Sequence, residues 1–523
     1  MAPVTPARRL PWVLTAAIIA KACWAMWMGW HGLPHTTSDG PCFKQPAYMR
    51  LYTPNFSIPS YAGNSPYYDL VNSYPSAVYT YANYLVFQLC GFSQFTSVAI
   101  DLSIHLLISA LGAWALWRLS ESQLAAIVFL LCSTQWLIPF GRPEEFGLLL
   151  VLIALLTLGR GTVGLATSIV ALGMAGASSP GAAVVGTVLL VSFEALQRGV
   201  WNNRMRLLLL LLFPVLISAI LYVGYVYPYL AEAFEQDRHM RETNFYYRIG
   251  LLQHFRSNFL WSIATFPLLI GAVGLAVAGL MRPPKWFPAH STAGNFVVAA
   301  GIAVLFGLGL NVAAQRPLYD YRHIIALAVA AWAIAAAWLQ ASGGAQRFAA
   351  WGIAGLLLAL SLPGQQMIAR QSLGLLTLTD EDFDFAEAKA LVDSVVPKHA
   401  TVGGDGNAWA MIDDGRPFLL TRTAAPELWP EYIISCTWAN PPAIAQRPID
   451  VQTLADHYEE LSLTPSLSSN GWILNLAGLK VPLSSGRCDW YPRIWKRRPP
   501  SEAAAVVPGG SEKAETAAAD DDR

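Results

Sequence analysis

Charged side chains are scarce in this sequence. Asp, Glu, Lys and Arg make up 13% of the 523 residues, against roughly 25% in soluble domains, whereas 54% are hydrophobic. The mean hydropathy is +0.40. Lys and Arg together number 34, as do Asp and Glu, so there is no basic excess of the kind that indicates nucleic acid as a partner. This composition excludes an ordinary soluble domain and predicts a polytopic α-helical membrane protein.

Common nucleotide- and metal-binding motifs are also missing. The sequence has no P-loop and no GxGxxG segment in a strand-turn-helix context. Its six cysteines form neither CxxC pairs nor a Cys/His zinc pattern. No cofactor is therefore implied, and a role for a divalent cation is left open. Cys436 and Cys488 lie in the polar C-terminal part and would be able to pair if that part is exported.

Long apolar runs dominate residues 1–370. The first follows Arg8 and Arg9 and has no evident small-residue cleavage site, which indicates an uncleaved helix. About eleven runs are long enough to span a bilayer, near residues 10–30, 98–119, 124–140, 146–158, 163–177, 182–196, 207–227, 259–280, 296–312, 324–339 and 350–362.

The positive-inside rule predicts the orientation of these spans. If residues 76–91 form a juxtamembrane helix that does not cross, most basic clusters between spans fall on the cytoplasmic side. The exceptions are Arg142 and the pair Arg316 with Arg322, which fall outside. We therefore predict a multi-pass membrane protein with a cytoplasmic N-terminus and an extracytoplasmic C-terminal domain.

The composition changes after residue 370, where acidic residues, Gly, Pro and Trp become frequent. We expect a small extracytoplasmic α/β domain over residues 371–500, with a helix at 386–396 and a strand near 401–404. Four tryptophans of this domain are expected to be packed core, with a carbohydrate-stacking surface as the alternative; they are Trp409, Trp429, Trp438 and Trp472. Residues 501–523 are expected to be a disordered tail.

Four polar segments share the outer face in this topology: the first external loop at 31–75, the turn at 141–145, the loop at 229–258 and residues 315–323. Asp39 in the first loop is a candidate general base, because a carboxylate within hydrogen-bond reach of an acceptor hydroxyl is able to take its proton. Its Ser-Asp-Gly context is also ordinary turn chemistry. Ionisable groups at membrane depth are costly, so their convergence on one face favours a functional site.

The turn at 141–145 and residues 315–323 carry arginines that are candidates for phosphate binding. Arg142 precedes Glu144 and Glu145, and the arginine is suited to phosphate while a glutamate orients an acceptor or a metal. Acidic residues in a first helical turn are also common for purely structural reasons. Arg322 and His323 offer phosphate donors, or belong to an interfacial belt. Within the apolar runs, Lys21 is expected to face Asp101 and His105 as a buried structural cluster.

These features resemble the GT-C superfamily of membrane glycosyltransferases, which use polyprenyl-phosphate donors. The similarity is greatest to the bacterial relatives of the protein O-mannosyltransferase and lipid A aminoarabinose transferase families, which makes the chain glycosyltransferase family 39-like. It rests on a charged first span, Asp39, Tyr74-Pro75 before an aromatic helix, Arg142-Pro143-Glu144, Tyr321-Arg322 and a terminal soluble domain. Ser76 stands where a second proline is common, and Pro143 offsets the acidic residue after Arg142.

The resemblance implies transfer of a sugar from a lipid-linked donor to a cell-envelope acceptor, which is a glycan, lipid or protein. Asp39 and Glu144 would be catalytic, with Asp39 as the base. Arg142, Arg322 and His323 would bind the donor phosphate. Four further residues would contact the acceptor or support those that do: Asp69, Tyr74, Glu145 and Tyr321. The alternatives are a polytopic transporter, against which no internal repeat is evident, and a non-catalytic envelope assembly protein.

Overall fold

The computed structural model describes most of the chain, including its apolar helices. The described residues are 11–31, 40–61, 70–72, 74, 76–136, 141–243, 259–314, 322–376, 385–404, 406, 408–420, 428–436, 457–461, 473–476, 479–482 and 492–499. Asp39, Asp69, Tyr321, Trp438, Trp472 and Cys488 lie outside these ranges, as do residues 501–523. The expectations that concern them stay predictions.

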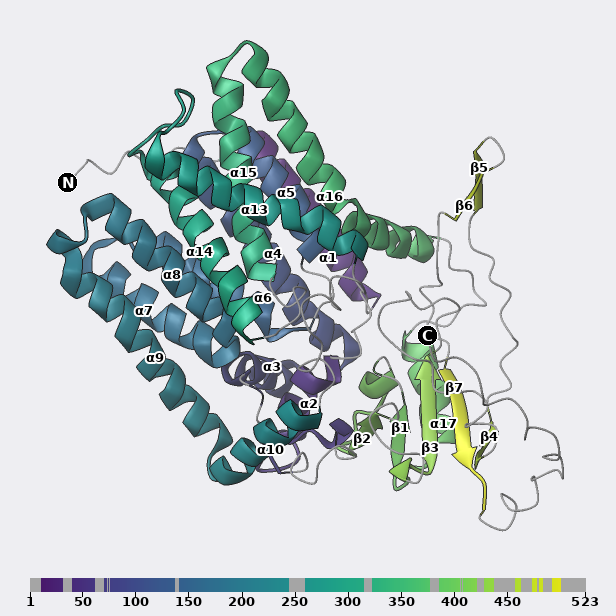
Figure 1. Cartoon of the computed structure of the whole chain (residues 1–523). Coiled ribbons are helices and arrows are strands. Elements are labelled where there is room, and N and C mark those ends of the chain that lie inside the picture. The colour runs from purple at the N-terminus through teal and green to yellow at the C-terminus, as the bar shows by residue number, and fades with distance from the viewer. Residues whose placement is uncertain are drawn as a thin grey trace, which may run out of the picture.

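Eleven helices lie at the eleven predicted apolar runs. Figure 1 shows how these helices pack into one bundle. They are α1 (Trp12–Trp30), α4 (Gln94–Ser120), α5 (Gln123–Trp136), α6 (Pro143–Thr157), α7 (Gly161–Ser178), α8 (Pro180–Arg198), α9 (Arg204–Val226), α13 (Phe259–Met281), α14 (Thr292–Ala314), α15 (Arg322–Ser342) and α16 (Ala345–Leu376). Seven of them, namely α1, α4, α7, α8, α9, α14 and α15, contain stretches long and apolar enough to cross a membrane. The number of crossings stays a prediction.

Three shorter helices lie at the lower end of this bundle in Figure 1: α2 (Gly40–Met49), α3 (Ala77–Cys90) and α10 (Leu230–Thr243). Helix α3 coincides with the predicted juxtamembrane helix. Its 14 residues equal those of α5, which lies at a predicted span, so its place beside the membrane stays a prediction. Local sequence explains the helix starts: Ser93 and Thr96 form a capping box at α4, and Ser179 caps α8 ahead of Pro180.

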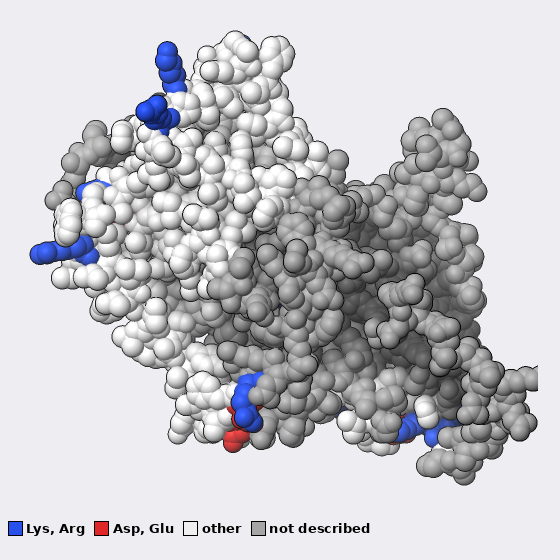
Figure 2. All heavy atoms as spheres, in the orientation of Figure 1, with Lys and Arg blue, Asp and Glu red and all other residues white. Residues whose placement is uncertain are grey.

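Exposed basic residues gather at the opposite end of the bundle. They lie within the terminal turns of the helices there or directly beside a helix end, at Arg118, Arg160, Arg198, Arg204, Arg282 and Arg347. Figure 2 shows blue atoms at its upper and left margins, whereas blue and red occur together at the lower end. This distribution is the one that the positive-inside rule requires if the upper end is cytoplasmic. The orientation itself stays a prediction.

The C-terminal domain contains a small mixed sheet. Its strand order is β2 (Phe418–Leu420), β1 (Val402–Gly404), β3 (Tyr432–Cys436), β7 (Pro492–Arg497) and β4 (Tyr458–Glu460). Strand β1 is parallel to β2 and β3, whereas β7 is antiparallel to β3 and β4. Strands β5 (Ile473–Leu476) and β6 (Leu479–Pro482) form a separate antiparallel pair.

Helix α17 (Phe385–Val395) precedes this sheet, which confirms the predicted helix, and β1 confirms the predicted strand. The expected domain boundary after residue 370 falls inside α16, which continues to Leu376. Trp409 and Trp429 are buried in hydrophobic clusters, which confirms the packed-core interpretation for these two tryptophans.

Close helix packing depends on glycine at the contact between α13 and α14. A Cβ atom on Gly301 would lie 2.7 Å from the backbone oxygen of Ala272 and 2.3 Å from the Cβ of Ala276. Gly309, two turns further along α14, has no atom within 4 Å of its Cβ position. Neither neighbour of Gly301 is a flexible side chain that would move aside.

We expect Gly301→Ala to destabilise the protein by about 1 to 3 kcal/mol, because overpacking forces the helices apart. Gly309→Ala is the matched control and is expected to be neutral or slightly stabilising. Denaturant unfolding of both variants in detergent would measure the difference. Equal stability of the two variants would contradict the close approach of α13 and α14.

Candidate functional site

The N-terminal turn of α6 carries three buried charged residues. Arg142 has an extended backbone (φ −112°, ψ 142°), Pro143 opens the helix, and Glu144 and Glu145 occupy the first turn. Proline suits this position because its missing N–H has no partner in the first turn, and acidic side chains there favour the helix dipole. The exposed fractions of Arg142, Glu144 and Glu145 are 8%, 7% and 2%. Such burial requires that each charge be paired.

Two arginines supply the cations that pair with Glu144 and Glu145. The Arg142 guanidinium donates from Nε to Glu144 Oε2 (3.2 Å) and from Nη2 to Oε1 (3.0 Å). Arg322, the first residue of α15, donates from Nη1 to Glu145 Oε1 over 2.7 Å, although 177 residues separate the two in sequence. The expected convergence of the 141–145 turn with the start of this late helix is therefore confirmed for Arg142, Glu144, Glu145 and Arg322.

Aromatic side chains enclose one side of this arrangement. The Tyr74 hydroxyl donates to Glu144 Oε1 over 3.4 Å. The rings of Phe43 and Tyr74 meet edge to face with centroids 4.9 Å apart. The Arg142 guanidinium carbon lies 5.6 Å from the Phe43 ring centroid, which is within cation–π range. Helix α2 and the segment before α3 thus contact the first turn of α6.

A third buried ion pair, Lys44 with Asp101, adjoins the first two. Lys44 on α2 donates to Asp101 Oδ2 on α4 and to the Ser97 carbonyl, and also to Ser97 Oγ over 3.1 Å. The Tyr79 hydroxyl of α3 donates to Asp101 Oδ1 over 2.7 Å. Burial raises the pKa of Tyr79, so its phenol keeps the proton that it donates. The carboxylates of Asp101 and Glu145 are near enough to repel each other, so the two groups of charges lie close together.

The sequence analysis missed this pair, since it expected Asp101 to face Lys21. Lys21 instead donates to Ser109 Oγ (2.9 Å), to the Leu130 carbonyl (3.0 Å) and to Ser133 Oγ (2.9 Å). The available signal was a carboxylate inside an apolar run, which predicts a buried cation nearby. The sequence did not indicate which lysine would supply it.

We call Lys44, Asp101, Arg142, Glu144, Glu145 and Arg322 the buried charge network. It contains three cations and three carboxylates in three ion pairs. Its formal charges balance, as charges in a low-dielectric interior must. An incoming anion would therefore bind by taking the place of a carboxylate on one of the arginines, which offer planar, bidentate donors.

His323 lies beside the network. It follows Arg322 on α15, is 3% exposed and interacts electrostatically with Glu144. A Cβ atom on Gly181 would come within 3.7 Å of its Cε1, so the start of α8 is also close. Among the described residues, no group of three or more His, Cys, Asp and Glu side chains is arranged to hold a metal ion.

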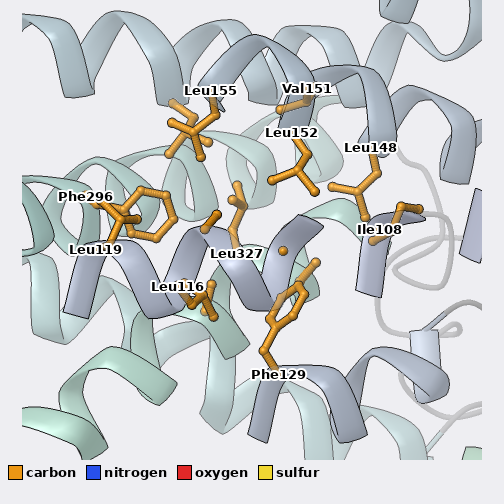
Figure 3. Close-up of a pocket in the computed structure, with 15 residues that line it drawn as sticks. Ile108, Leu116, Leu119, Phe129, Leu148, Val151, Leu152, Leu155, Phe296 and Leu327 are labelled. Carbon is orange, nitrogen blue, oxygen red and sulfur yellow. The ribbon is translucent and has the colours of Figure 1, made fainter. Parts of the chain in front are cut away.

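An apolar cavity of about 50 Å³ lies within the helices that carry the network (Figure 3). Its lining comes from α4, α5, α6, α8, α14 and α15 and has no polar side chain. It begins at Leu148, one turn after Glu144, and at Ile108, two turns after Asp101. The lining continues along α4 to Leu119, a distance of about 16 Å at 1.5 Å per residue.

Comparisons with known proteins assign no family. No protein-family model matches the sequence, and a search of curated proteins gives no match. Among solved structures, the oligosaccharyltransferase of Archaeoglobus fulgidus, crystallised with a tethered acceptor peptide containing the NVT sequon, is similar over 81% of this chain and 69% of its own. The sequence identity is 13% and the TM-score 0.42. A similarity at this level assigns neither an activity nor residue roles to the chain.

Proposed function

We propose that this chain is a GT-C-like integral membrane glycosyltransferase. It would move a sugar from a polyprenyl-phosphate donor to a cell-envelope acceptor at the extracytoplasmic face of a bacterial inner membrane. The observation that carries the proposal is the meeting of Arg142 and Arg322 in one buried charge network, at the end of the bundle opposite the exposed basic residues. Arginines at that end depart from the positive-inside rule, and retention for a negatively charged ligand accounts for the departure.

In this proposal the donor phosphate binds to Arg142 and Arg322, with His323 as a further donor. Each arginine would exchange its glutamate contact for phosphate oxygens, so that the two carboxylates become available to other groups. The apolar cavity that starts one turn from Glu144 has a volume of only about 50 Å³, which is too small for a polyprenyl chain, so the lipid chain would extend along the apolar outer surface of the helices below the arginines. The cations of the network would face the anionic phosphate and the apolar helices would face the lipid chain, which are the two parts of a polyprenyl phosphate.

Asp39 directly precedes α2, which carries Phe43 and Lys44 into the site. As a general base, its carboxylate would take the proton of the acceptor hydroxyl while the acceptor oxygen bonds to the anomeric carbon. The bond from that carbon to the phosphate oxygen breaks at the same time, and the arginines stabilise the departing phosphate. Attack from the face opposite the phosphate inverts the sugar configuration. Glu144 and Tyr74 would orient the acceptor, with Asp69, Glu145 and Tyr321 behind them.

The test is transfer of label from a radiolabelled polyprenyl-phosphate sugar pool by purified protein in lipid. Asp39→Asn is expected to lower the rate by about 100-fold or more, because general-base catalysis typically contributes that much. Asp393→Asn is the matched control: this carboxylate is exposed on α17 and pairs only with Lys389 among the described residues. Transfer by the control should equal that of the wild type.

The outcomes separate the parts of the proposal. Equal transfer by wild type and Asp39→Asn would reject Asp39 as the base and leave the transferase activity standing. If no donor tested gives transfer by folded wild-type protein, the transferase proposal fails. Substrate uptake into liposomes would then test the transporter alternative.

A further inference from the structure

Helix α2 lies between the helical bundle and the C-terminal domain. Every side chain from Phe43 to Met49 is buried. Toward the bundle, Lys44 binds Asp101 and Phe43 contacts both Tyr74 and Arg142. Figure 1 shows α2 beside α3 on one side and beside the edge strand β2 of the domain on the other. The helix that supplies one charge of the network is thus also a contact surface for the C-terminal domain.

The domain contacts α2 through hydrogen bonds as well as apolar packing. Gln45 Nε2 donates to the carbonyl of Phe418 in β2 over 3.2 Å, and Gln45 Oε1 accepts from the Ser60 amide over 2.9 Å. The Gly415 amide donates to the Tyr48 hydroxyl over 2.6 Å, across 367 residues of sequence. The Tyr48 ring meets Trp409 edge to face with centroids 6.1 Å apart.

A helix of this size has little stability of its own. It has ten residues and contains Pro46, whereas isolated helices shorter than about 12 to 15 residues are marginal in water. Its position is therefore set by what it packs against. Because Gln45 immediately follows Lys44, a shift of Gln45 relative to Phe418 also moves Lys44 relative to Asp101.

We infer that the C-terminal domain is a positioning element of the buried charge network, and that Gln45 and Tyr48 are the positioning residues that hold Lys44 against Asp101 from the domain side. For the sugar transfer itself, the inference rests on the proposed function. The placement of Lys44 does not, so it is tested without any donor or acceptor.

The test alters the C-terminal domain and measures the reactivity of the Lys44 amine. Gly415 has a φ of +85°, and a Cβ atom there would lie 2.7 Å from the Tyr52 ring, so Gly415→Ala strains the backbone and displaces the loop from Tyr48. Purified full-length protein in lipid nanodiscs is treated with a small amine-acylating reagent, and modification of Lys44 is followed by mass spectrometry. Lys285, exposed at the other end of the bundle, is the reference in the same sample.

Wild-type Lys44 has no exposed surface and is expected to react slowly. In Gly415→Ala we expect its modification, relative to Lys285, to be about tenfold faster or more, which corresponds to the loss of one buried hydrogen bond. Tyr458→Phe is the matched control, because it removes a buried hydrogen bond to the Pro430 carbonyl in the same domain, away from α2. It should leave the Lys44 rate unchanged.

Tyr48→Phe provides a second variant that keeps the ring and removes only the hydroxyl, in case Gly415→Ala fails to fold. Unchanged Lys44 modification in the folded variants would overturn the inference. Equal acceleration in Tyr458→Phe would also overturn it, since general loosening of the domain would then be sufficient. Absence of sugar transfer in the separate assay would reject the proposed function and leave the labelling result valid.

Discussion

Asp101→Ala is expected to lower the free energy of unfolding by about 3 to 5 kcal/mol, the cost of removing one partner of a buried ion pair. Lys44 has no exposed surface and would lose the carboxylate that compensates its charge. The Tyr79 hydroxyl would lose its acceptor at the same time. Denaturant titration of the purified protein in micelles, followed by tryptophan fluorescence, would measure the loss.

Two further variants show whether burial of the pair is responsible. Lys44→Met combined with Asp101→Leu replaces both charges by apolar groups and is expected to recover the stability lost through the unpaired charge, because an apolar pair of similar volume carries no desolvation cost. The loss of the acceptor of the Tyr79 hydroxyl remains in this variant. Asp393→Ala removes an exposed carboxylate from a surface pair and is expected to cost less than about 1 kcal/mol. If Asp101→Ala cost no more than Asp393→Ala, Lys44 would have to be solvated.

The sequence predicted the parts of the bundle that depend on chain direction alone. Long apolar runs specify helices. Because successive spans run in opposite directions, the residues that connect them lie alternately on the two faces of the membrane. This is why Arg142 and Arg322 were expected to converge although no motif connects them. Whether Asp39 and Tyr321 join them stays a prediction, because both lie outside the described residues.

The partner of Asp101 was not predictable in the same way. Lys44 lies on a ten-residue helix with little periodic pattern, and its position depends on contacts from α3, α4 and the C-terminal domain. Lys21, in the middle of an apolar run, was the more obvious cation, yet hydroxyl and carbonyl oxygens surround it. Tertiary packing decides which buried charges pair with each other, and a single sequence contains little information about that packing.

The domain sheet illustrates the same limit. Its helix and first strand were expected, but β7 pairs with β3 and lies between it and β4, an order fixed by contacts between distant segments. The burial of Trp409 followed from the general preference of tryptophan for packed surroundings. Its contact with Tyr48 of α2 did not, because nothing in either segment specifies the other.

Arg322→Gln is expected to abolish most of the proposed transfer and to destabilise the protein by about 3 to 5 kcal/mol, because Glu145 would remain buried without its cation. Loss of activity in this single variant would not distinguish a structural role from phosphate binding. The double variant Glu145→Gln with Arg322→Gln removes both charges and preserves side chains able to hydrogen-bond to each other. Its stability is expected to return close to that of the wild type.

Transfer by this double variant is expected to stay about 100-fold or more below wild type, because an uncharged amide cannot stabilise the departing phosphate as the guanidinium does. The matched control is Glu194→Gln with Arg206→Gln, which removes another Glu–Arg ion pair (Nε to Oε1, 2.8 Å) at the opposite end of the bundle and leaves the exposed Arg198, the second cation on Glu194, in place. This control is expected to transfer sugar normally. If the Glu145/Arg322 variant did so as well, Arg322 would be a structural partner of Glu145, and the donor phosphate would have to depend on Arg142 and the remaining donors at that end.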